Sequence, residues 1–485
     1  MQPEWGKITT AELIGPIQGK LVSGQQDIPF AGLSTDSRKA GRGELFWALK
    51  GEKYDGHDFA QKALQSGASG VVICERYLAH LQAQLESGLT QDLQVIITVE
   101  DTLKSLGELA RWWRNQYDVS VVAVTGSTGK TTTKEMCTCI LEQGASVLKS
   151  HGNFNNLIGV PLTLLRLTPG VSRVVLEMGM NHPGEIARLT QIGNPDLGVI
   201  TNVGKVHLEG IGSVEQVARA KTELIEESSP AADMIVNGDD PLLMKAARRL
   251  RQDLFTFGMR PQNDVYAGEV QENTIEGISF VLHHGEGSWP VNLRVPGHHN
   301  VQNALAAAAV GFSVGMGPDQ IVKGLEEFRG IEGRFTIERL SSGITVIDDT
   351  YNANPEALRV ALETGKSLVP KGGRFLVALG DMLELGDAAI MEHRAAGRLV
   401  TDVGAAAFVI LGEYAQDMAE GAKEAGFPEK YLAAAESHEY MVEILTREAR
   451  EGDIVLFKAS RLMGLGRVVE LFKAAMERER AADAV

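Results

Sequence analysis

The sequence predicts an α/β protein of three domains, and three observations predict that fold class. The chain has 485 residues, which is too long for a single hydrophobic core. Short apolar runs alternate with amphipathic stretches, as they do in βαβ units around a parallel sheet. A Gly-rich passage at residues 330–334 interrupts this alternation, which then restarts. We therefore expect a small α/β N-terminal domain at residues 1–99, a central parallel-sheet domain at residues 100–332 and a C-terminal Rossmann-like domain at residues 333–485.

In the N-terminal region, short β-like runs are separated by Gly-rich turns. The expected strands are Leu45–Leu49, Gly70–Cys74 and Val95–Val99. An amphipathic helix is expected from Thr102 to Asn115, and it leads into residues 119–124, a pattern typical of a buried strand.

The central region continues with apolar runs that stop abruptly at polar residues or glycine. The predicted strands there are Val174–Glu177, Leu197–Val203 and Met234–Val236. Residues 264–294 alternate apolar and polar side chains, which predicts antiparallel hairpins, and an Ala-rich helix is expected from Asn300 past Val310. The passage at residues 330–334 is expected to act as a hinge. Strands then resume at Thr345–Asp348, Arg374–Leu379, Phe408–Leu411 and Asp453–Phe457.

The composition is that of an acidic globular protein. The formal net charge is −16 and the pI is about 5.3, which argues against a nucleic-acid partner because such a surface needs clustered Lys and Arg. The longest apolar stretch, Ala304–Met316, is too short to span a bilayer, so no membrane insertion is expected. Three cysteines cannot build a disulfide framework, so we expect a cytoplasmic protein. We also expect a monomer.

Polar residues of this chain follow apolar runs at the places where strands are expected to end. Six runs end in this way, and the residues that follow them are Lys130, Glu177, His207, Asp348 with Asp349, Asp381, and Lys458 with Arg461. In open α/β sheets, ligands gather at the carboxyl ends of the strands. Scattered surface polarity would rarely coincide with strand ends so often, so the sequence predicts a site there.

A phosphate-binding loop is predicted at residues 125–131, which read Thr-Gly-Ser-Thr-Gly-Lys-Thr between a strand and a helix. Glycines allow backbone N–H groups to approach phosphate oxygens, and the helix N-terminus adds a positive dipole end. Lys130 would then lie between the β- and γ-phosphates of a nucleoside triphosphate, with the Thr131 hydroxyl on Mg²⁺. The usual loop has a glycine where Val124 stands, so this is the shorter form of the pattern.

Other candidate residues are ambiguous when they are taken singly. Glu177 could complete a Mg²⁺ shell beside the loop, or it could be a solvated turn residue. His207 could equally be a cap or a surface group, and Lys221, on an expected helix, could be a solvated lysine. Asn300 and Asn303 could be a helix cap and a first-turn residue.

Together these pieces resemble the Mur ligase family, the ATP-dependent amide ligases of bacterial cell-wall synthesis. The matching segments run in family order: residues 125–132, Glu177-Met-Gly, Thr201-Asn-Val-Gly-x-x-His207, Ala220-Lys221-x-Glu223, Pro296-Gly-His-His-Asn300-Val-Gln-Asn303 and Gly333-Arg334. The flanks resemble the last-acting member of the family, through Thr35-Asp-Ser-Arg38, Phe46–Gly51, Asp55–Phe59, Gly152–Pro161, Asp348–Pro355 and Gly380–Gly386. The resemblance covers nearly the whole chain, up to about Lys473.

The resemblance implies ATP and two Mg²⁺ ions as cofactors. Gly126, Ser127, Thr128, Gly129, Lys130, Thr131 and Thr132 would bind the ATP phosphates, Asn300 and Asn303 would flank the adenine, and Arg334 and Asp349 would reach the nucleotide from the third domain. Thr131, Glu177 and His207 would lie at the magnesium ions, and Lys221 matches the lysine that the family often carries as a carbamate. Lys130, Glu177, His207 and Lys221 would be the catalytic residues.

The resemblance also implies two small-molecule substrates, UDP-N-acetylmuramoyl-tripeptide and D-alanyl-D-alanine. Thr35, Asp36, Ser37, Arg38, Lys50 and Gly51 resemble the UDP-sugar site, and Asn153, Asn155 and Asn156 would touch the muramoyl-peptide. Tyr351, Asn352, Asn354, Asp381 and Arg461 would line the D-alanyl-D-alanine side.

The chemistry that the resemblance implies suits these residue types. Transfer of the γ-phosphoryl group of ATP to a carboxylate gives an acyl phosphate, which an amine attacks through a tetrahedral intermediate. Cations must screen the carboxylate from the γ-phosphate, and Lys130 with two Mg²⁺ ions can do so.

Other functions stay open at this point. They are a sister ligase that adds a single amino acid, a folylpolyglutamate synthase and, from another class, a P-loop switch or motor ATPase. A nicotinamide-dependent oxidoreductase is excluded, because residues 380–386 lack the Gly-x-Gly-x-x-Gly pattern of a pyrophosphate turn.

Overall fold

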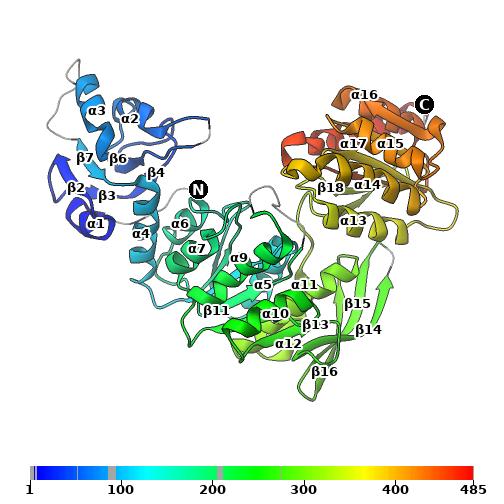
Figure 1. Ribbon diagram of the computed structural model, residues 1–485, viewed down its shortest axis with the longest axis horizontal. Coiled ribbons are helices and arrows are strands. Elements are labelled where there is room, and N and C mark those ends of the chain that lie inside the picture. Colours follow the sequence, from blue (N-terminus) through cyan, green and yellow to red (C-terminus); the bar gives the residue numbers. More distant parts are fainter. Residues whose placement is uncertain are drawn as a thin grey trace. The chain divides into compact units, whose positions relative to one another are not determined.

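The computed structural model of the protein describes residues 5, 8–51, 53–85, 94–204, 211–273 and 275–483. It shows an α/β protein of three domains, as the sequence predicts (Figure 1). The backbone packs into two compact units, one of Met1–Thr125, Leu141–Val199 and Thr222–Met234, and one of Gly126–Ile140, Ile200–Lys221 and Ile235–Val485. The boundaries expected near residues 99 and 332 stay predictions.

The N-terminal domain is built on a five-stranded sheet with the order β2-β7-β6-β5-β4, beside a two-stranded ribbon of β1 and β3. Its strands are β1 Ile8–Thr9, β2 Lys20–Ser23, β3 Pro29–Phe30, β4 Gly32–Ser34, β5 Glu44–Trp47, β6 Gly70–Cys74 and β7 Val95–Val99. Its helices are α1 Thr10–Ile17, η1 Gly56–Phe59, α2 Ala60–Gln65, η2 Glu75–Tyr77, α3 Leu78–Leu85 and α4 Thr102–Arg114.

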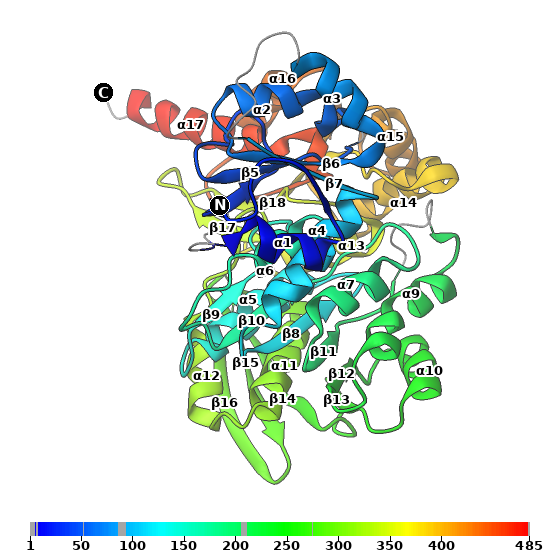
Figure 2. The same cartoon turned by 90° about the vertical axis from the view of Figure 1, so that its left-hand side faces the viewer.

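Strands β4 to β7 are parallel, and helices cover both faces of their sheet. The side chains of α2 and α3 pack with Phe46, Val71 and Ile96 in one core, while α1 and α4 pack together and against the sheet's other face (Figure 2). Strands β6 and β7 are buried along their whole length, because a parallel sheet covered on both faces needs apolar side chains on both.

The central domain carries a nine-stranded sheet with the order β16-β15-β14-β13-β12-β11-β8-β10-β9. Its strands are β8 Ser120–Thr125, β9 Val147–Lys149, β10 Arg173–Glu177, β11 Leu197–Ile200, β12 Asp233–Asn237, β13 Phe255–Gly258, β14 Val265–Asn273, β15 Gly277–His284 and β16 Gly287–Leu293. Its helices are α5 Lys130–Leu141, α6 Gly159–Leu164, α7 Glu185–Gly193, α9 Val214–Glu227, α10 Pro241–Leu250, α11 His298–Ser313 and α12 Pro318–Glu327. Strands β14 to β16 pair antiparallel, which confirms the predicted hairpins.

One expectation for this domain was wrong in detail. Strand β11 ends at Ile200, so it is shorter than the predicted strand Leu197–Val203. Helix α11 begins at His298, close to the expected start at Asn300, and its N-cap is Gly297. Asn300 is therefore not the cap; its amide donates to the carbonyl of Pro296, which precedes the helix, at 2.7 Å.

The C-terminal domain has a six-stranded sheet, order β17-β18-β22-β19-β20-β21, in which β17 is antiparallel and the others are parallel. Its strands are β17 Thr336–Arg339, β18 Thr345–Asp349, β19 Phe375–Gly380, β20 Ala407–Leu411, β21 Leu432–Ala435 and β22 Ile454–Lys458. Its helices are α13 Pro355–Ser367, η3 Gly386–Ala388, α14 Ala389–Asp402, α15 Ala415–Glu424, η4 Glu429–Tyr431, α16 His438–Glu448, η5 Arg461–Met463 and α17 Leu465–Asp483.

Helices cover both faces of this third sheet, as in a Rossmann-like domain. One core joins the sheet to α13, α14 and α15, and a second core joins its other face to α16 and α17 (Figure 1). Among the described residues, no helix is long and apolar enough to cross a membrane.

Candidate functional site

The predicted phosphate loop lies between β8 and α5, so strand, loop and helix follow one another as expected. Two of its glycines have positive φ angles and are closely covered. A Cβ on Gly126 (φ 146°) would lie 1.9 Å from the Thr201 hydroxyl, and one on Gly129 (φ 77°) would lie 2.3 Å from the Asn303 Oδ1. Both positions therefore require glycine.

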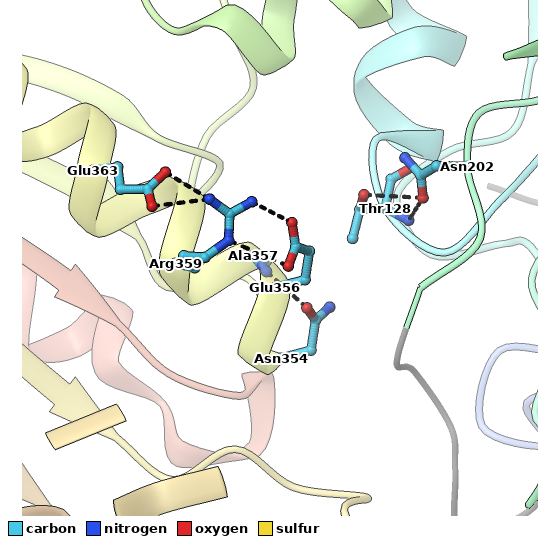
Figure 3. Close-up of polar contacts among 7 residues, drawn as sticks. All are labelled: Thr128, Asn202, Asn354, Glu356, Ala357, Arg359 and Glu363. Carbon is cyan, nitrogen blue, oxygen red and sulfur yellow. Dashed lines mark hydrogen bonds and ion pairs between the residues drawn. The ribbon is translucent and has the colours of Figure 1, made fainter. Parts of the chain in front are cut away.

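Asn202 is the residue that holds the loop in shape, and it was quoted in the motif without a role. Its Oδ1 accepts from the Thr128 backbone N–H at 2.9 Å and from the Thr128 hydroxyl at 3.2 Å (Figure 3). The Thr201 hydroxyl donates to the Thr128 carbonyl at 2.6 Å, and the Gly204 N–H donates to the Ser127 hydroxyl at 2.8 Å. The segment that follows β11 thus supports the loop from one side.

Lys130 is the first residue of α5, and its ammonium bends back over the loop. Its Nζ donates to the Gly126 carbonyl at 2.8 Å and to the Ser127 carbonyl at 3.2 Å. Thr131 is buried and Thr132 is half-buried in the same helical turn. The structure thus gathers the residues predicted to bind phosphate, residues 126–132, around one helix N-terminus.

Asn300 and Asn303 are both buried in the first turns of α11. The Asn303 amide donates to the Asn300 Oδ1 at 3.4 Å, and its Oδ1 accepts from the Thr133 hydroxyl of α5 at 3.3 Å. The structure therefore brings Asn303 against α5, the helix that carries Lys130.

Glu177, the last residue of β10, is 2% exposed, so it is not a solvated turn residue. Its Oε1 accepts from the Asn155 amide at 2.9 Å, and its backbone N–H donates to the Ser150 hydroxyl at 3.1 Å. Its Oε2 is buried and has no hydrogen-bond partner among the described residues. A buried carboxylate oxygen without a partner suits a cation.

The structure describes only one of the other two metal candidates, Lys221 and His207. Lys221 lies in α9 and is 0% exposed, so it is not the solvated lysine that it could have been. His207 lies outside the described residues. Within the described part of the chain, no three His, Cys, Asp or Glu side chains come together as a metal-ligand group.

The Asn-rich segment after β9 divides into different uses. Asn155 contacts Glu177 as described, and its carbonyl accepts from the Gly179 N–H at 2.7 Å. Asn156 accepts from the backbone N–H groups of Ile158 and Gly159 at 3.1 and 2.9 Å, so it supports the start of α6. Asn153 is exposed, which leaves its side chain accessible to a ligand.

In the C-terminal domain, two arginines lie close to the Tyr351 ring. The guanidinium carbon of Arg334 is 4.0 Å from the centre of the Tyr351 ring, and that of Arg461 is 5.5 Å from it. The Arg334 Nε is buried and has no hydrogen-bond partner among the described residues. Three residues that sequence reasoning assigned to two ligands therefore cluster at one ring, with donors suited to an anion.

Lys458 is a residue of this region that sequence reasoning noted at a strand end but left without a role. It is 2% exposed, and its ammonium donates to Asp349 Oδ2 at 2.5 Å and to the Asn352 carbonyl at 3.0 Å. Asp349 also accepts from the Phe335 backbone N–H at 3.1 Å. The predicted nucleotide contact Asp349, which is half-buried, is therefore paired with a buried lysine.

Two predicted dipeptide-side residues have their side chains bonded to the backbone. Both oxygens of the buried Asp381 accept N–H groups, from Glu413 at 2.7 Å and from Tyr414 at 3.2 Å. The Asn354 Oδ1 accepts from the Ala357 N–H at 2.8 Å and caps α13 (Figure 3). The Asn352 side chain is exposed beside them. The structure thus gives Asp381 and Asn354 a supporting role.

His393 supports the loop that follows Asp381. Its ring is fully buried, its Nε2 accepts from the Met382 N–H at 2.9 Å, and its Nδ1 is 2.6 Å from the Ala389 carbonyl. It stacks on Tyr414 with ring centres 4.4 Å apart. No sequence motif pointed to this histidine.

The predicted UDP-sugar residues lie after two neighbouring parallel strands, β4 and β5. Arg38 donates to Asp36 through Nε and Nη2, both at 2.9 Å, and these bonds lower the pKa of the Asp36 carboxyl to about 2. Thr35 and Arg38 are exposed and Ser37 is buried, while Lys50 and Gly51 are exposed in the loop after β5. Because β4 and β5 are parallel neighbours, these two segments follow strand ends on the same side of the sheet.

Family models match three stretches of the chain. They are "Mur ligase family, catalytic domain" at residues 29–114, "Mur ligase middle domain" at residues 124–311 and "Mur ligase, glutamate ligase domain" at residues 333–461. A curated UDP-N-acetylmuramoyl-tripeptide–D-alanyl-D-alanine ligase from Bacillus subtilis (strain 168) is 34% identical over 465 residues, which are 96% of this chain and 98% of the relative. The chain belongs to the Mur ligase family.

Other relatives of this Mur ligase agree with that placement. A ligase of the same name from Escherichia coli (strain K12) is 38% identical over 78% of this chain and 80% of the relative. A crystal structure of MurF from Acinetobacter baumannii matches with a TM-score of 0.84 and 31% identity, covering 97% of this chain and 100% of the other. MurF from Thermotoga maritima in complex with ADP matches with a TM-score of 0.79 and 29% identity, covering 92% and 98%.

Proposed function

We propose that this Mur ligase uses ATP to join D-alanyl-D-alanine to the terminal carboxylate of UDP-N-acetylmuramoyl-tripeptide, in the synthesis of peptidoglycan precursors. The similarity to the Bacillus subtilis ligase of that name, over nearly the full length of both chains, carries the proposal. The phosphate loop, which Asn202 holds through Thr128, and the ADP complex of the Thermotoga maritima relative support ATP as the co-substrate. The products would be ADP, phosphate and UDP-N-acetylmuramoyl-pentapeptide.

The reaction needs an activated carboxylate. Its oxygen attacks the γ-phosphorus of ATP, the bond to the β-phosphate oxygen breaks, and an acyl phosphate and ADP form. The amine of D-alanyl-D-alanine then adds to the acyl carbon, and the tetrahedral intermediate expels phosphate. In this proposal the Lys130 ammonium exchanges its two loop carbonyls for phosphate oxygens, so its charge screens the approach of the two anions.

Magnesium fits the residues that are present. Glu177 offers a buried oxygen without a partner, and Asn155 fixes the other oxygen of that carboxylate. Thr131 and His207 would complete the protein's share of the ligands, and a carbamate on the buried Lys221 would add another carboxylate. Bound Mg²⁺ would neutralise charge on the phosphates, and it usually takes only one or two protein carboxylates with water and phosphate.

The substrate residues are proposed by position. Thr35, Asp36, Ser37, Arg38, Lys50 and Gly51 would hold the UDP-sugar, Asn153 and Asn155 the muramoyl-peptide, and Tyr351, Asn352 and Arg461 the dipeptide. Asn300, Asn303, Arg334 and Asp349 would surround the nucleotide. Because ATP and UDP-linked precursors are the substrates, we place the reaction in the cytoplasm, and we propose a monomer as the active state.

The test is phosphate release from ATP, UDP-N-acetylmuramoyl-tripeptide and D-alanyl-D-alanine, with each omitted in turn. We expect turnover only with all three present. Phosphate release that does not depend on D-alanyl-D-alanine would favour an ATPase switch, and turnover with a single amino acid would favour a sister ligase. A Lys130→Ala variant that retains full activity would remove the loop's proposed role.

A further inference from the structure

The loop between β5 and η1 carries Lys50 and Gly51, which the proposed function assigns to the UDP-sugar. Backbone bonds close the loop at its base, where the Gly56 N–H donates to the Leu49 carbonyl at 2.8 Å. Lys50 and Asp55 form an antiparallel bridge. The described outer residues of the loop, Lys50, Gly51, Lys53 and Tyr54, are exposed, so packing alone does not hold them. A loop of this kind keeps one conformation only when its base is fixed.

Asp55 fixes that base through its carboxylate. The Tyr77 hydroxyl donates to Oδ2 at 2.6 Å, and the His57 ring nitrogen Nδ1 lies 2.5 Å from Oδ1. The His57 backbone N–H also donates to Oδ1, at 3.0 Å. Burial disfavours the ionised form, but the bonds from Tyr77 and His57 outweigh it and lower the pKa of the Asp55 carboxyl to about 2. Asp55 is therefore ionised at neutral pH with both oxygens bonded.

His57 joins Asp55 to the centre of the sheet. Its Nε2 accepts from the backbone N–H of Cys74, the last residue of β6, at 3.0 Å. Since a nitrogen that accepts carries no proton, the proton of the neutral ring is on Nδ1, where it is donated to Asp55. The ring is buried, and it stacks on Tyr77 with centres 4.0 Å apart and planes 12° from parallel. These atoms are occupied within the protein, so they act on a ligand only through the loop.

We propose that Asp55, His57 and Tyr77 are positioning residues that hold the loop from Leu49 to Tyr54 in the conformation that binds the uridine nucleotide of the substrate. This inference rests on the proposed function. Gly56 is consistent with this proposal. A Cβ there would lie 2.6 Å from the Leu49 carbonyl oxygen, so the two sides of the loop's base can approach this closely only with glycine at that position. The other proposed nucleotide segment, Thr35–Arg38, follows β4, whose end lies beside that of β5.

The test uses two variants in the full chain. Tyr77→Phe removes only the hydroxyl that donates to Asp55 and keeps the ring that stacks on His57. His57→Gln keeps an acceptor for the Cys74 N–H but loses the donor to Asp55. The matched control is His80→Gln, the same substitution at an exposed histidine of α3 whose ring nitrogen Nε2 lies 3.0 Å from the Gln84 side-chain nitrogen.

The KM values for the three substrates and amide hydrogen exchange together separate positioning from general damage. We expect Tyr77→Phe and His57→Gln to raise the KM for UDP-N-acetylmuramoyl-tripeptide about tenfold, since each removes one hydrogen bond to a charged group, with the KM for ATP and for D-alanyl-D-alanine unchanged. Amide hydrogen exchange should accelerate at residues 49–56 in both variants, and β6 should keep its protection. His80→Gln should match the unmodified protein in the three KM values and in hydrogen exchange.

Direct binding of UDP, measured by calorimetry, keeps this inference apart from the proposed function. If UDP binds the unmodified chain and both variants weaken it about tenfold, the inference stands even if no ligase turnover is found. If the variants speed exchange at residues 49–56 but leave UDP affinity and the KM for the nucleotide substrate unchanged, the inference is wrong. Equal increases in all three KM values would also overturn it, because they would indicate general damage.

Discussion

A single amide fixes the orientation of the carboxylate at the end of β10. The Asn155 Nδ2 donates to Glu177 Oε1, which leaves the buried Oε2 as the oxygen available to a cation. Without that donor, both oxygens of Glu177 would be buried without a fixed geometry, which costs about 1–3 kcal/mol for each group left unsatisfied. In the proposed magnesium site, Glu177 would remain as a ligand but its carboxylate would no longer be held in a fixed orientation.

We therefore expect Asn155→Ala to lower kcat by about tenfold to a hundredfold and to raise the Mg²⁺ concentration needed for half-maximal phosphate release. Asn115→Ala, at an exposed position in the same compact unit, is the control and should change neither value. An Asn155→Ala enzyme with an unchanged Mg²⁺ requirement would show that Glu177 needs no such support.

The pair of Asp36 and Arg38 gives a pH prediction. Because the folded-state pKa of about 2 lies below the ordinary value of 3.8, the pair's contribution is complete above pH 3.8 and is lost as the pH falls through about 2. Carbon-13 NMR of the labelled aspartate carboxyls should show a midpoint near 2 for Asp36, which moves toward 3.8 in Arg38→Gln. A midpoint near 3.8 in the unmodified protein would contradict the pairing in solution.

At the residue scale, sequence reasoning located positions better than roles. Glu177, Asp349 and Lys458 are the last residues of their strands and Asp381 directly follows β19, because buried parallel strands are continuous apolar runs in sequence. Lys130 instead begins α5, and His207 lies outside the described residues. The same positions serve two purposes, however. Asp381 and Asn354 turn their oxygens to backbone N–H groups, whereas Glu177 keeps one oxygen unbonded among the described residues. For Asp381 and Glu177 the purpose depends on partners more than twenty residues away, which spacing along the chain does not reveal, whereas Asn354 bonds to Ala357 three residues further on.

At the scale of elements, the conformation of the phosphate loop depends on the side chains that lie close to its glycines. We expect Gly126→Ala to weaken ATP binding about tenfold to a hundredfold, because a strained, crowded residue costs roughly 1–3 kcal/mol and the Thr201 hydroxyl would have to move. The matched control is Gly170→Ala, where φ is also positive (100°) but no heavy atom lies within 4 Å. Its cost should be about 1–2 kcal/mol of stability, with ATP affinity unchanged when measured by calorimetry. Equal losses in both variants would mean that backbone strain alone, without crowding, explains the loop.

Helix α13 begins with a side-chain cap and carries an exposed ion-pair group. Arg359 pairs with Glu356 at 2.5 Å and with Glu363 at 2.7 Å on its surface, while Asn354 caps its first turn (Figure 3). We expect Asn354→Ala to lower the free energy of unfolding by about 1 kcal/mol in urea titrations, and Asn354→Asp to restore most of it. The comparison variant is Ser437→Ala, which removes the equivalent cap of α16, a 3.1 Å bond to the Tyr440 N–H. A fully stable Asn354→Ala protein would show that the cap contributes nothing.

The elements themselves were predictable where their burial is uniform. Strands β6 and β7 have the bounds that the sequence predicts, because every residue in each is buried. Strand β11 is shorter than its run because the chain after Ile200 turns to support the phosphate loop, and the apolar Val203 there is bonded through its N–H to Asp240. At this point, contacts of the following segment, and not the apolar pattern, decide where the strand ends.

At the scale of the whole molecule, the expected hinge stays a prediction. The passage has two glycines with positive φ, Gly330 at 88° and Gly333 at 70°, and an isolated bridge between Ile331 and Arg334. We expect small-angle scattering to show a smaller radius of gyration when an ATP analogue and UDP-N-acetylmuramoyl-tripeptide are added together. Lys130→Ala should show no such change, and identical curves with and without ligands would contradict closure.

Two buried histidines, His57 and His393, offer a way to observe the outer domains separately. His57 and His393 each accept a backbone N–H at Nε2, and each stacks on a tyrosine ring, one in the N-terminal and one in the C-terminal domain. Both are therefore held as the tautomer with the proton on Nδ1. Nitrogen-15 spectroscopy distinguishes that tautomer from the more common one in water, so two signals would report, domain by domain, whether each loop is ordered while a substrate binds.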